Sequence, residues 1–266
     1  MSVARYIESL TIACEALPGR LAERPLTFRA VTRGEPGPPP PPLPAAALPE
    51  DLQAAVDAGT LLSFVDGLSP QERDDVLFSV QLAHRGASGA FNRFTNTEAW
   101  YNKYMDILNR LGWAAEQLAF VRHDQSQGEI RMDQAALAVI TAIATQNQLA
   151  VLNAAVKALE ELAEEDSTIR LFDFQTAASA SANFQIGAVQ KADNGALGMA
   201  MGAFHVQGLD TRRRFLFFSW GAQKIQFWTA AQKMTLNTTF YAQHRHLVIK
   251  ALGAGVADYI GGLTLA

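Results

Sequence analysis

The sequence has a single cysteine and no long apolar run. Cys14 is the one cysteine among 266 residues, so no disulfide can form within the chain. No run of about 18 apolar residues occurs, so the sequence predicts no membrane-spanning helix. The first 19 residues contain Arg5, Glu8 and Glu15 and no unbroken apolar segment, which does not fit a cleavable signal peptide. We therefore expect a cytoplasmic protein, or one released or delivered without such a peptide.

Charge is missing from two long stretches near the C-terminus. Residues 174–190 contain no Asp, Glu, Lys or Arg, and residues 194–209 contain none either. Solvent-facing hairpins usually carry charges, partly because a charge stops an exposed edge from pairing with another chain. This region is therefore predicted to be buried on both faces, covered by a partner, or adapted to an apolar surface.

The remaining charge is unevenly distributed. Charged residues make up 18% of the chain against a usual value of about 25%, and the net charge of −4 argues against nucleic acid as a partner. Residues 171–266 hold eight basic and four acidic residues, whereas the part before them is net acidic. Copies of the chain could pair head to tail through these halves. Acidic helix ends would give the same imbalance without any pairing.

The motifs that would indicate catalysis are also missing. There is no Gly-x-Ser-x-Gly elbow, and the glycines at 195, 198 and 202 lack the Lys-Ser/Thr ending of a phosphate loop. His244 and His246 would share one face of a strand, but a catalytic zinc site usually needs a third ligand and no spacing supplies one. The sequence therefore predicts no catalytic residue, no metal site and no cofactor.

Prolines and helix signals divide the chain into four parts. Five consecutive prolines, Pro38 to Pro42, predict a polyproline II spacer. We expect an N-terminal arm with one helix (1–33), a proline-rich linker (34–48), a helical domain (49–170) and an antiparallel β domain (171–266).

Several helices are expected before residue 170. Residues 49–58 predict a short helix that Gly59 ends, and Ser69-Pro70-Gln71-Glu72 is typical of a capped helix start. Thr95 to Glu98 predicts a second capping box. Residues 133–165 predict two helices or one kinked helix, because four polar residues from Thr145 to Gln148 break the apolar phase.

The pattern changes to alternation after residue 170. The turn signal Asn194-Gly195 separates a strand at 184–189 from a return strand at 196–206. The return strand places Leu197, Met199 and Met201 on one face and Gly198, Ala200 and Gly202 on the other.

Further strands are predicted at 215–218, 224–227 and 234–240, and glycines make a long helix unfavourable in the last 22 residues. The fold class is α+β: a helical N-terminal half followed by an antiparallel β-meander or sandwich in the C-terminal half.

The charge-poor β half favours a non-enzymatic binding or self-assembling protein. Its partner would be another copy of the chain, another protein or a membrane. In a toxin-like version, residues 183–207 leave the core and enter a bilayer, for which a strand needs about 9–11 residues. A spanning strand should alternate apolar and polar residues, however, and here the second face is Gly and Ala.

The candidate residues follow from this interpretation. The contact candidates for a partner or membrane are Leu197, Met199, Met201, Phe204, Phe217 and Trp228, and the anion or headgroup candidates are Arg212, Arg213 and Arg214. Two alternatives stay open. One is an enzyme without a recognisable motif that acts at the junction of the two halves, and the other is a β-sandwich module that binds a small ligand.

Overall fold

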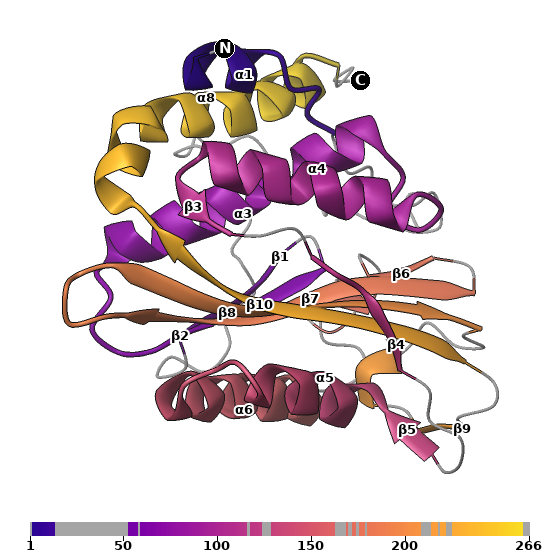
Figure 1. Ribbon diagram of the computed structural model, residues 1–266. Coiled ribbons are helices and arrows are strands. Elements are labelled where there is room, and N and C mark those ends of the chain that lie inside the picture. The colour runs from indigo at the N-terminus through magenta and orange to yellow at the C-terminus, as the bar shows by residue number, and fades with distance from the viewer. Residues whose placement is uncertain are drawn as a thin grey trace, which may run out of the picture.

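In the computed structural model, one main sheet lies between two layers of helices (Figure 1). Cys14, the proline-rich segment 34–48, Arg212 and Arg213 lie outside the residues that the structure describes. The described residues are 2–13, 53–57, 59–115, 118–123, 129–162, 169, 172–173, 176–178, 180–208, 214–217, 219–221 and 225–262.

Three long antiparallel strands form the centre of the main sheet. They are β7 (Ser181–Lys191), β8 (Leu197–Gln207) and β10 (Gln226–Leu236), with β8 in the middle. The shorter strands are β1 (Ala54–Asp57), β2 (Thr60–Phe64), β3 (Trp113–Ala114), β4 (Val121–His123) and β6 (Ala177–Ala178). Only the pairing of β2 with β7 is parallel among the described strands. The sheet therefore combines strands from before and after residue 170.

Helices cover both faces of this sheet (Figure 1). The helices on one face are α1 (Val3–Glu8), α3 (Pro70–Ala90), α4 (Thr97–Arg110) and α8 (Thr238–Gly262). Those on the other face are α5 (Met132–Thr141) and α6 (Gln146–Glu161). A 3-10 turn, η1 (Phe215–Phe217), and a two-stranded ribbon of β5 (Glu129–Arg131) and β9 (Ser219–Gly221) complete the described elements. The predicted mixture of helices and strands is confirmed, whereas the predicted sandwich or meander is not.

The two faces of the sheet belong to two separate hydrophobic cores. On β8, Leu197, Met199 and Met201 pack into the core beneath α3 and α4. Ala200 and Phe204 pack into the core beneath α5 and α6. The alternation read from the sequence is confirmed, because successive strand residues point to opposite faces.

Local signals at two element ends are also confirmed. Gly195 has φ +81 in the turn between β7 and β8, which suits glycine. Ser69 and Glu72 form the predicted capping box at the start of α3. The predicted polar break separates two helices, α5 and α6, and is itself a capping box, from Thr145 to Gln148, that starts α6.

The helix predicted for residues 49–58 is wrong where the structure describes that segment. Ala54–Asp57 is strand β1, which pairs with β2 so that Asp57 lies opposite Thr60. Gly59 has φ +78 in the turn between them. It serves the turn of a hairpin rather than the end of a helix, and pairing in the sheet overrides the helix propensity of the alanines.

The expectation against a long C-terminal helix is also wrong. Thr238–Gly262 forms α8, a helix of 25 residues, and the predicted strand 234–240 ends at Leu236. Asn237 starts the helix by accepting a hydrogen bond from the backbone N–H of Phe240 at 2.9 Å. Each glycine costs a helix about 1 kcal/mol relative to alanine. Burial of residues such as Tyr241 and Val248 offsets that cost.

Two shorter predictions are corrected as well. Phe215–Phe217 is a 3-10 turn rather than a strand, and it follows Arg214, whose φ is +47. The capping box expected from Thr95 to Glu98 does not form. Asn96 is the N-cap of α4, and its side chain makes no capping hydrogen bond.

The small residues on β8 allow α5 to approach the sheet closely. A Cβ placed on Gly202 would lie 2.9 Å from Cγ1 of Ile140 on α5 and 2.5 Å from the ring of Phe204. The glycine is therefore required by packing at this position. At Gly198, on the same face, a Cβ would meet nothing closer than a carbonyl oxygen at 3.8 Å.

We predict that Gly202→Ala destabilises the protein, whereas Gly198→Ala does not. Overpacking at Gly202 should lower the free energy of unfolding by about 1–3 kcal/mol. The matched change at Gly198 should leave it unchanged or raise it by about 0.5 kcal/mol, because alanine restricts the unfolded chain. Chemical denaturation of both variants measures the difference, and equal losses would contradict the close approach of α5.

Candidate functional site

The candidate site is the hairpin of β7 and β8, residues 181–207, together with the helices that cover it. The two strands have 11 residues each, and Lys191 is the one charged residue within them. Leu197, Met199, Met201 and Phe204 are each at most 1% exposed. These four contact candidates therefore lie beneath helices rather than on the surface.

The other two contact candidates lie elsewhere. Phe217 is half-buried in η1 and packs against the core under α5 and α6. Trp228 is half-buried on β10, with its ring centroid 5.4 Å from that of His205. The six candidates are thus divided between both faces of the sheet and do not form one patch in this arrangement.

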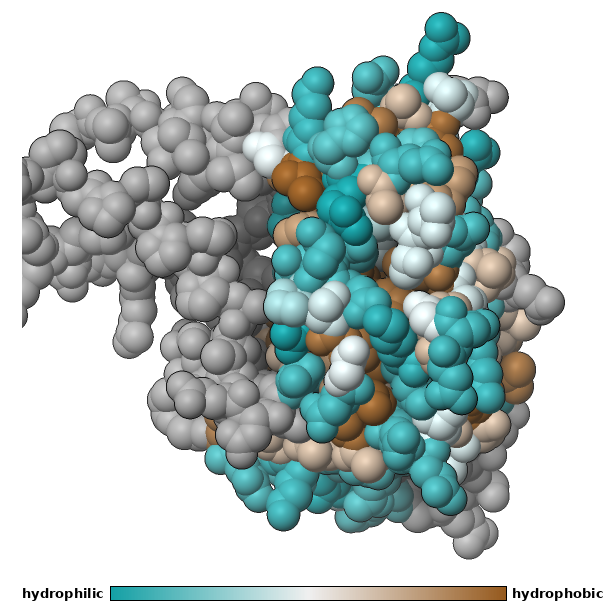
Figure 2. Space-filling view, turned by 90° about the vertical axis from the view of Figure 1, so that its left-hand side faces the viewer, coloured by the Kyte–Doolittle hydropathy of each residue, from teal (hydrophilic) through white to brown (hydrophobic). Residues whose placement is uncertain are grey.

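The surface of the molecule at the turn end of the hairpin is mostly hydrophilic. Figure 2 shows this side, where hydrophobic side chains appear only in small areas between hydrophilic ones. Among the described residues, the large hydrophobic side chains classed as exposed are Phe91, Val121 and Ile249. The helices thus hide the apolar surface of the hairpin and replace it with polar side chains.

The face of the hairpin toward α5 and α6 is entirely apolar along most of its length. On β7 it consists of Ala182, Phe184, Ile186 and Ala188, and on β8 of Gly198, Ala200, Gly202, Phe204 and Val206. Gln148 of α6 is the buried polar side chain placed above this face. Its amide donates to the backbone oxygens of Ala188, at 3.0 Å, and Gly198, at 3.2 Å. These bonds fix the start of α6 on both strands.

The opposite face carries polar side chains toward α4. Asn183 of β7 accepts a hydrogen bond from the Tyr101 hydroxyl at 2.7 Å and donates to the backbone oxygen of Arg93 at 2.8 Å. Gln185 of β7 accepts from the Thr60 hydroxyl at 2.6 Å. The hairpin therefore has one apolar face and one partly polar face, although both are buried.

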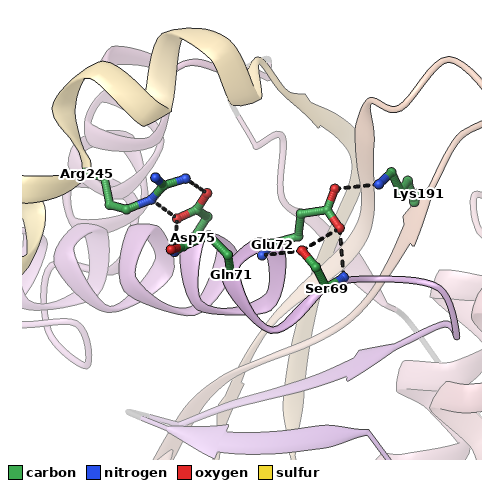
Figure 3. A network of polar contacts seen from close by, with 6 residues as sticks. All are labelled: Ser69, Gln71, Glu72, Asp75, Lys191 and Arg245. Atoms are coloured by element: carbon green, nitrogen blue, oxygen red, sulfur yellow. Dashed lines mark hydrogen bonds and ion pairs between the residues drawn. The ribbon is translucent and has the colours of Figure 1, made fainter.

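An ion pair attaches α3 to the turn end of the hairpin (Figure 3). Lys191 of β7 lies 2.7 Å from a carboxylate oxygen of Glu72. The other oxygen of Glu72 accepts from the backbone N–H and the hydroxyl of Ser69. The hydrogen bond from Lys191 and those from Ser69 lower the pKa of Glu72, so this carboxyl group stays ionised well into mild acid.

A second ion pair attaches α8 to α3 (Figure 3). Arg245 donates to both carboxylate oxygens of Asp75, at 2.6 and 2.5 Å, and Gln71 also donates to Asp75. The Asp75 side chain is 3% exposed. A paired geometry of this kind is strong because two parallel hydrogen bonds join the charges.

A buried histidine lies between α3 and α4. His84 is 1% exposed, its Nε2 is 2.6 Å from a guanidinium nitrogen of Arg93, and its ring meets Trp100 edge-on. Burial, then the charges of Arg93 and Arg85, hold the pKa of His84 well below its usual range. His84 is therefore neutral at neutral pH.

The one described residue of the predicted basic cluster has a structural role. Arg214 donates to the backbone oxygens of Glu160 and Leu162 at the C-terminal end of α6, and its backbone N–H donates to Asp173. A cation suits this position, because the last carbonyls of a helix carry partial negative charge. Its guanidinium thus binds a helix end in this arrangement rather than an external anion.

The histidines at 244 and 246 lie on α8, where neighbouring residues point in different directions. His244 bonds to the backbone oxygen of Phe240 at 3.0 Å, and His246 is exposed. Within the described part of the chain, no group of three metal-ligating side chains comes together. No described helix is long and apolar enough to cross a membrane.

Comparison with known proteins yields distant structural likenesses. No protein-family model matches the sequence, and no curated protein matches it. The chain is similar in fold to a delta-endotoxin, at 13% identity and a TM-score of 0.41, over 76% of this chain and 91% of that one.

Two further solved structures are similar. The Evf virulence factor matches at 9% identity and a TM-score of 0.35, over 78% of this chain and 85% of that one. The activated Cyt2Ba monomer from Bacillus thuringiensis subsp. israelensis matches at 8% identity and 0.37, over 66% and 96%. Likenesses as low as these do not carry a function from those proteins to this chain.

Sequence reasoning missed the polar residues that attach the helices to the hairpin. Gln148 was read as part of a phase break, and Asp75 and Arg245 are 170 positions apart. One signal was available. Asp75 and His84 lie on the inward side of a helix whose other inward residues are apolar except for Ser79, and buried polar residues need partners.

We predict that Arg245→Met destabilises the protein by about 3 kcal/mol, because it leaves the buried carboxylate of Asp75 without its counter-charge. Methionine keeps most of the aliphatic stem. The control is Lys157→Met, which removes an exposed pair with Glu161 and should cost less than about 0.5 kcal/mol. Thermal denaturation compares them, and equal effects would show that Asp75 does not hold α8.

Proposed function

We propose that this protein is a non-catalytic, membrane-acting protein that self-assembles through the β7–β8 hairpin after its covering helices move away. One observation carries the proposal. The hairpin has two 11-residue strands with one charged residue, one face that is apolar except for Gln190 at the turn end and one partly polar face, and helices cover both faces. The two helix layers shield both faces of this hairpin from water while they cover it.

The length of the strands fits a bilayer. At about 3.3 Å per residue, 11 residues extend for about 36 Å. A tilted strand needs about 9–11 residues to cross the hydrocarbon core. Lys191 and Asp193 lie at or beside the turn, which is the position where a spanning hairpin would place its charges in water.

The pattern of the two faces also supports the proposal. Spanning strands turn apolar residues to lipid and polar residues to the other side. The face now under α5 and α6 has no polar side chain from Ala182 to Ala188 or from Gly198 to Val206. The other face has Asn183, Gln185 and His205. The apolar face would meet lipid once α5 and α6 leave.

Self-assembly follows from the same geometry. A hairpin that leaves the sheet has two unpaired edges, and unpaired backbone groups are costly in hydrocarbon. Pairing with hairpins of other copies removes those edges. The proposal therefore joins membrane contact and self-association in one step, which needs no cofactor.

The direct test uses vesicles loaded with a fluorescent dye. In a Cys14→Ser background, an NBD fluorophore is attached at Asp193→Cys in the turn or, as a control, at Lys157→Cys on the outer side of α6. We expect dye release, together with protection of the turn fluorophore from dithionite added outside the vesicles. The control fluorophore should stay accessible. Absence of release, or a turn that stays accessible during release, would overturn the proposal.

We also predict that Gln148→Ala accelerates dye release, because it removes the hydrogen bonds that hold α6 on β7 and β8. Each lost bond to a buried group costs about 1–3 kcal/mol. Gln146→Ala is the matched control, because Gln146 is an exposed glutamine in the same helical turn. Equal release rates for the two variants would show that the departure of α6 is not part of the process.

A further inference from the structure

Two buried histidines lie at the end of the hairpin that is farthest from its turn. His205 is 7% exposed on β8, directly opposite Asn183 of β7 in the antiparallel register. Asn183 holds the backbone oxygen of Arg93 in the connection between α3 and α4, and Arg93 contacts His84. The connection between α3 and α4 therefore contacts His84 through Arg93 and borders the same hollow as His205.

Protonation of His84 is incompatible with its hydrogen bond. The guanidinium of Arg93 can only donate, so Nε2 of His84 accepts and the neutral ring carries its proton on Nδ1. A second proton would have to bind Nε2, the atom that accepts from Arg93. Uptake of a proton therefore breaks the contact and places two cations together in a buried site.

The charges that lower the pKa of His84 are the positive charges of Arg93 and of Arg85 on the same helix. Tyr101 and Tyr104 of α4 are buried, and burial raises the pKa of both, so they stay uncharged in this pH range. The residue that faces the cluster from β7 is the neutral Asn183.

His205 adds a second, weaker site. Burial lowers the pKa of His205, which lies beside Trp228 of β10 and contacts Gln207 of its own strand. It borders a shallow hollow of about 500 Å³ that Phe94, Asn102 and Glu98 of the α3–α4 region also line. Glu98 is the acidic group across this hollow, and it is exposed. A protonated His205 would be a buried cation beside the α3–α4 connection.

We propose that the contact of His84 with Arg93 forms an acid-sensitive lock, which holds the α3–α4 layer on the end of the hairpin through Asn183 while the imidazole is neutral and releases it when His84, with His205 beside the same junction, takes up a proton. The lock would regulate the membrane action proposed above, so its regulatory role rests on the proposed function. Both layers must leave the hairpin before it can enter a bilayer, and this lock controls the layer opposite α5 and α6.

The direction of the pH effect follows from linkage. Histidine released from the junction has a pKa near about 6.5, whereas the folded site binds protons less readily. As pH falls below about 6.5, the open state takes up protons that the closed state does not. The opening equilibrium then rises by up to about tenfold per pH unit for each histidine, and it is independent of pH above about 7.5.

The test compares His84→Gln with His246→Gln. Glutamine can accept from Arg93 and does not titrate, and His246 is an exposed histidine on α8 that serves as the matched control. Hydrogen exchange of α4, expressed as protection factors so that the chemical pH dependence cancels, is measured at about pH 7.5 and about pH 5.5. The protection factors of α4 should fall in acid in the wild type and in His246→Gln. In His84→Gln this fall should be smaller, by a factor of up to about ten per pH unit.

Further outcomes separate the lock from the proposed function. Equal acid dependence of wild type and His84→Gln overturns the lock. If His84→Gln does not fold, the imidazole signals of the wild-type protein decide by NMR. Two histidines that titrate below the ordinary range while α4 opens support the lock, and ordinary titration of every histidine overturns it.

Vesicles provide the second arm. Phosphatidylcholine vesicles, with and without phosphatidylserine, are mixed with wild type at the same two pH values. Faster dye release in acid that His84→Gln reduces supports the lock. Release that is equal at both pH values overturns the lock and leaves the membrane function in place. If α4 loses protection in acid but no dye is released at either pH, the lock is supported and the proposed membrane function is overturned.

Discussion

The burial of the β7–β8 hairpin on both faces is the constraint on which the rest of this structure depends. A strand pair with one charged residue cannot face water on either side without exposing a large apolar surface. Two layers of helices solve this problem by placing their apolar sides on the sheet and their polar sides in solvent. The close approach of α5 then requires Gly202, because a side chain there would collide with Ile140.

Apolar cores hold both helix layers on the sheet, and the two layers differ in their polar attachments. In the layer of α5 and α6, Gln148 bonds to both strands of the hairpin. The layer of α3 and α4 is attached at both ends of the hairpin by polar groups, the Glu72–Lys191 pair at the turn and Asn183 at the far end. Apolar packing responds to a lipid surface, whereas polar contacts respond to pH and salt. The proposed release therefore has two separate controls.

The parts of the fold that were predictable depend on local sequence. The turn at Gly195 and the alternating faces of β8 follow from residue types that are adjacent in the chain. Strand β1 could not be predicted, because its alanines favour a helix until β2 pairs with them. Helix α8 forms although its glycines predict against a long helix, because the packing of its buried residues outweighs the low helix propensity of glycine. The contact between His84 and Arg93 was missed because no motif marks it, although it joins residues nine positions apart.

The proposed function requires the covering helices to separate from the hairpin when the protein binds a membrane. Double electron–electron resonance measures this separation directly, with spin labels at Lys157→Cys on α6 and Asp193→Cys in the turn, in a Cys14→Ser background. We expect one narrow distance distribution in solution and a longer, broader one on vesicles. A distance that stays unchanged while the protein is bound to vesicles would contradict the proposed function, because the hairpin would then still be covered.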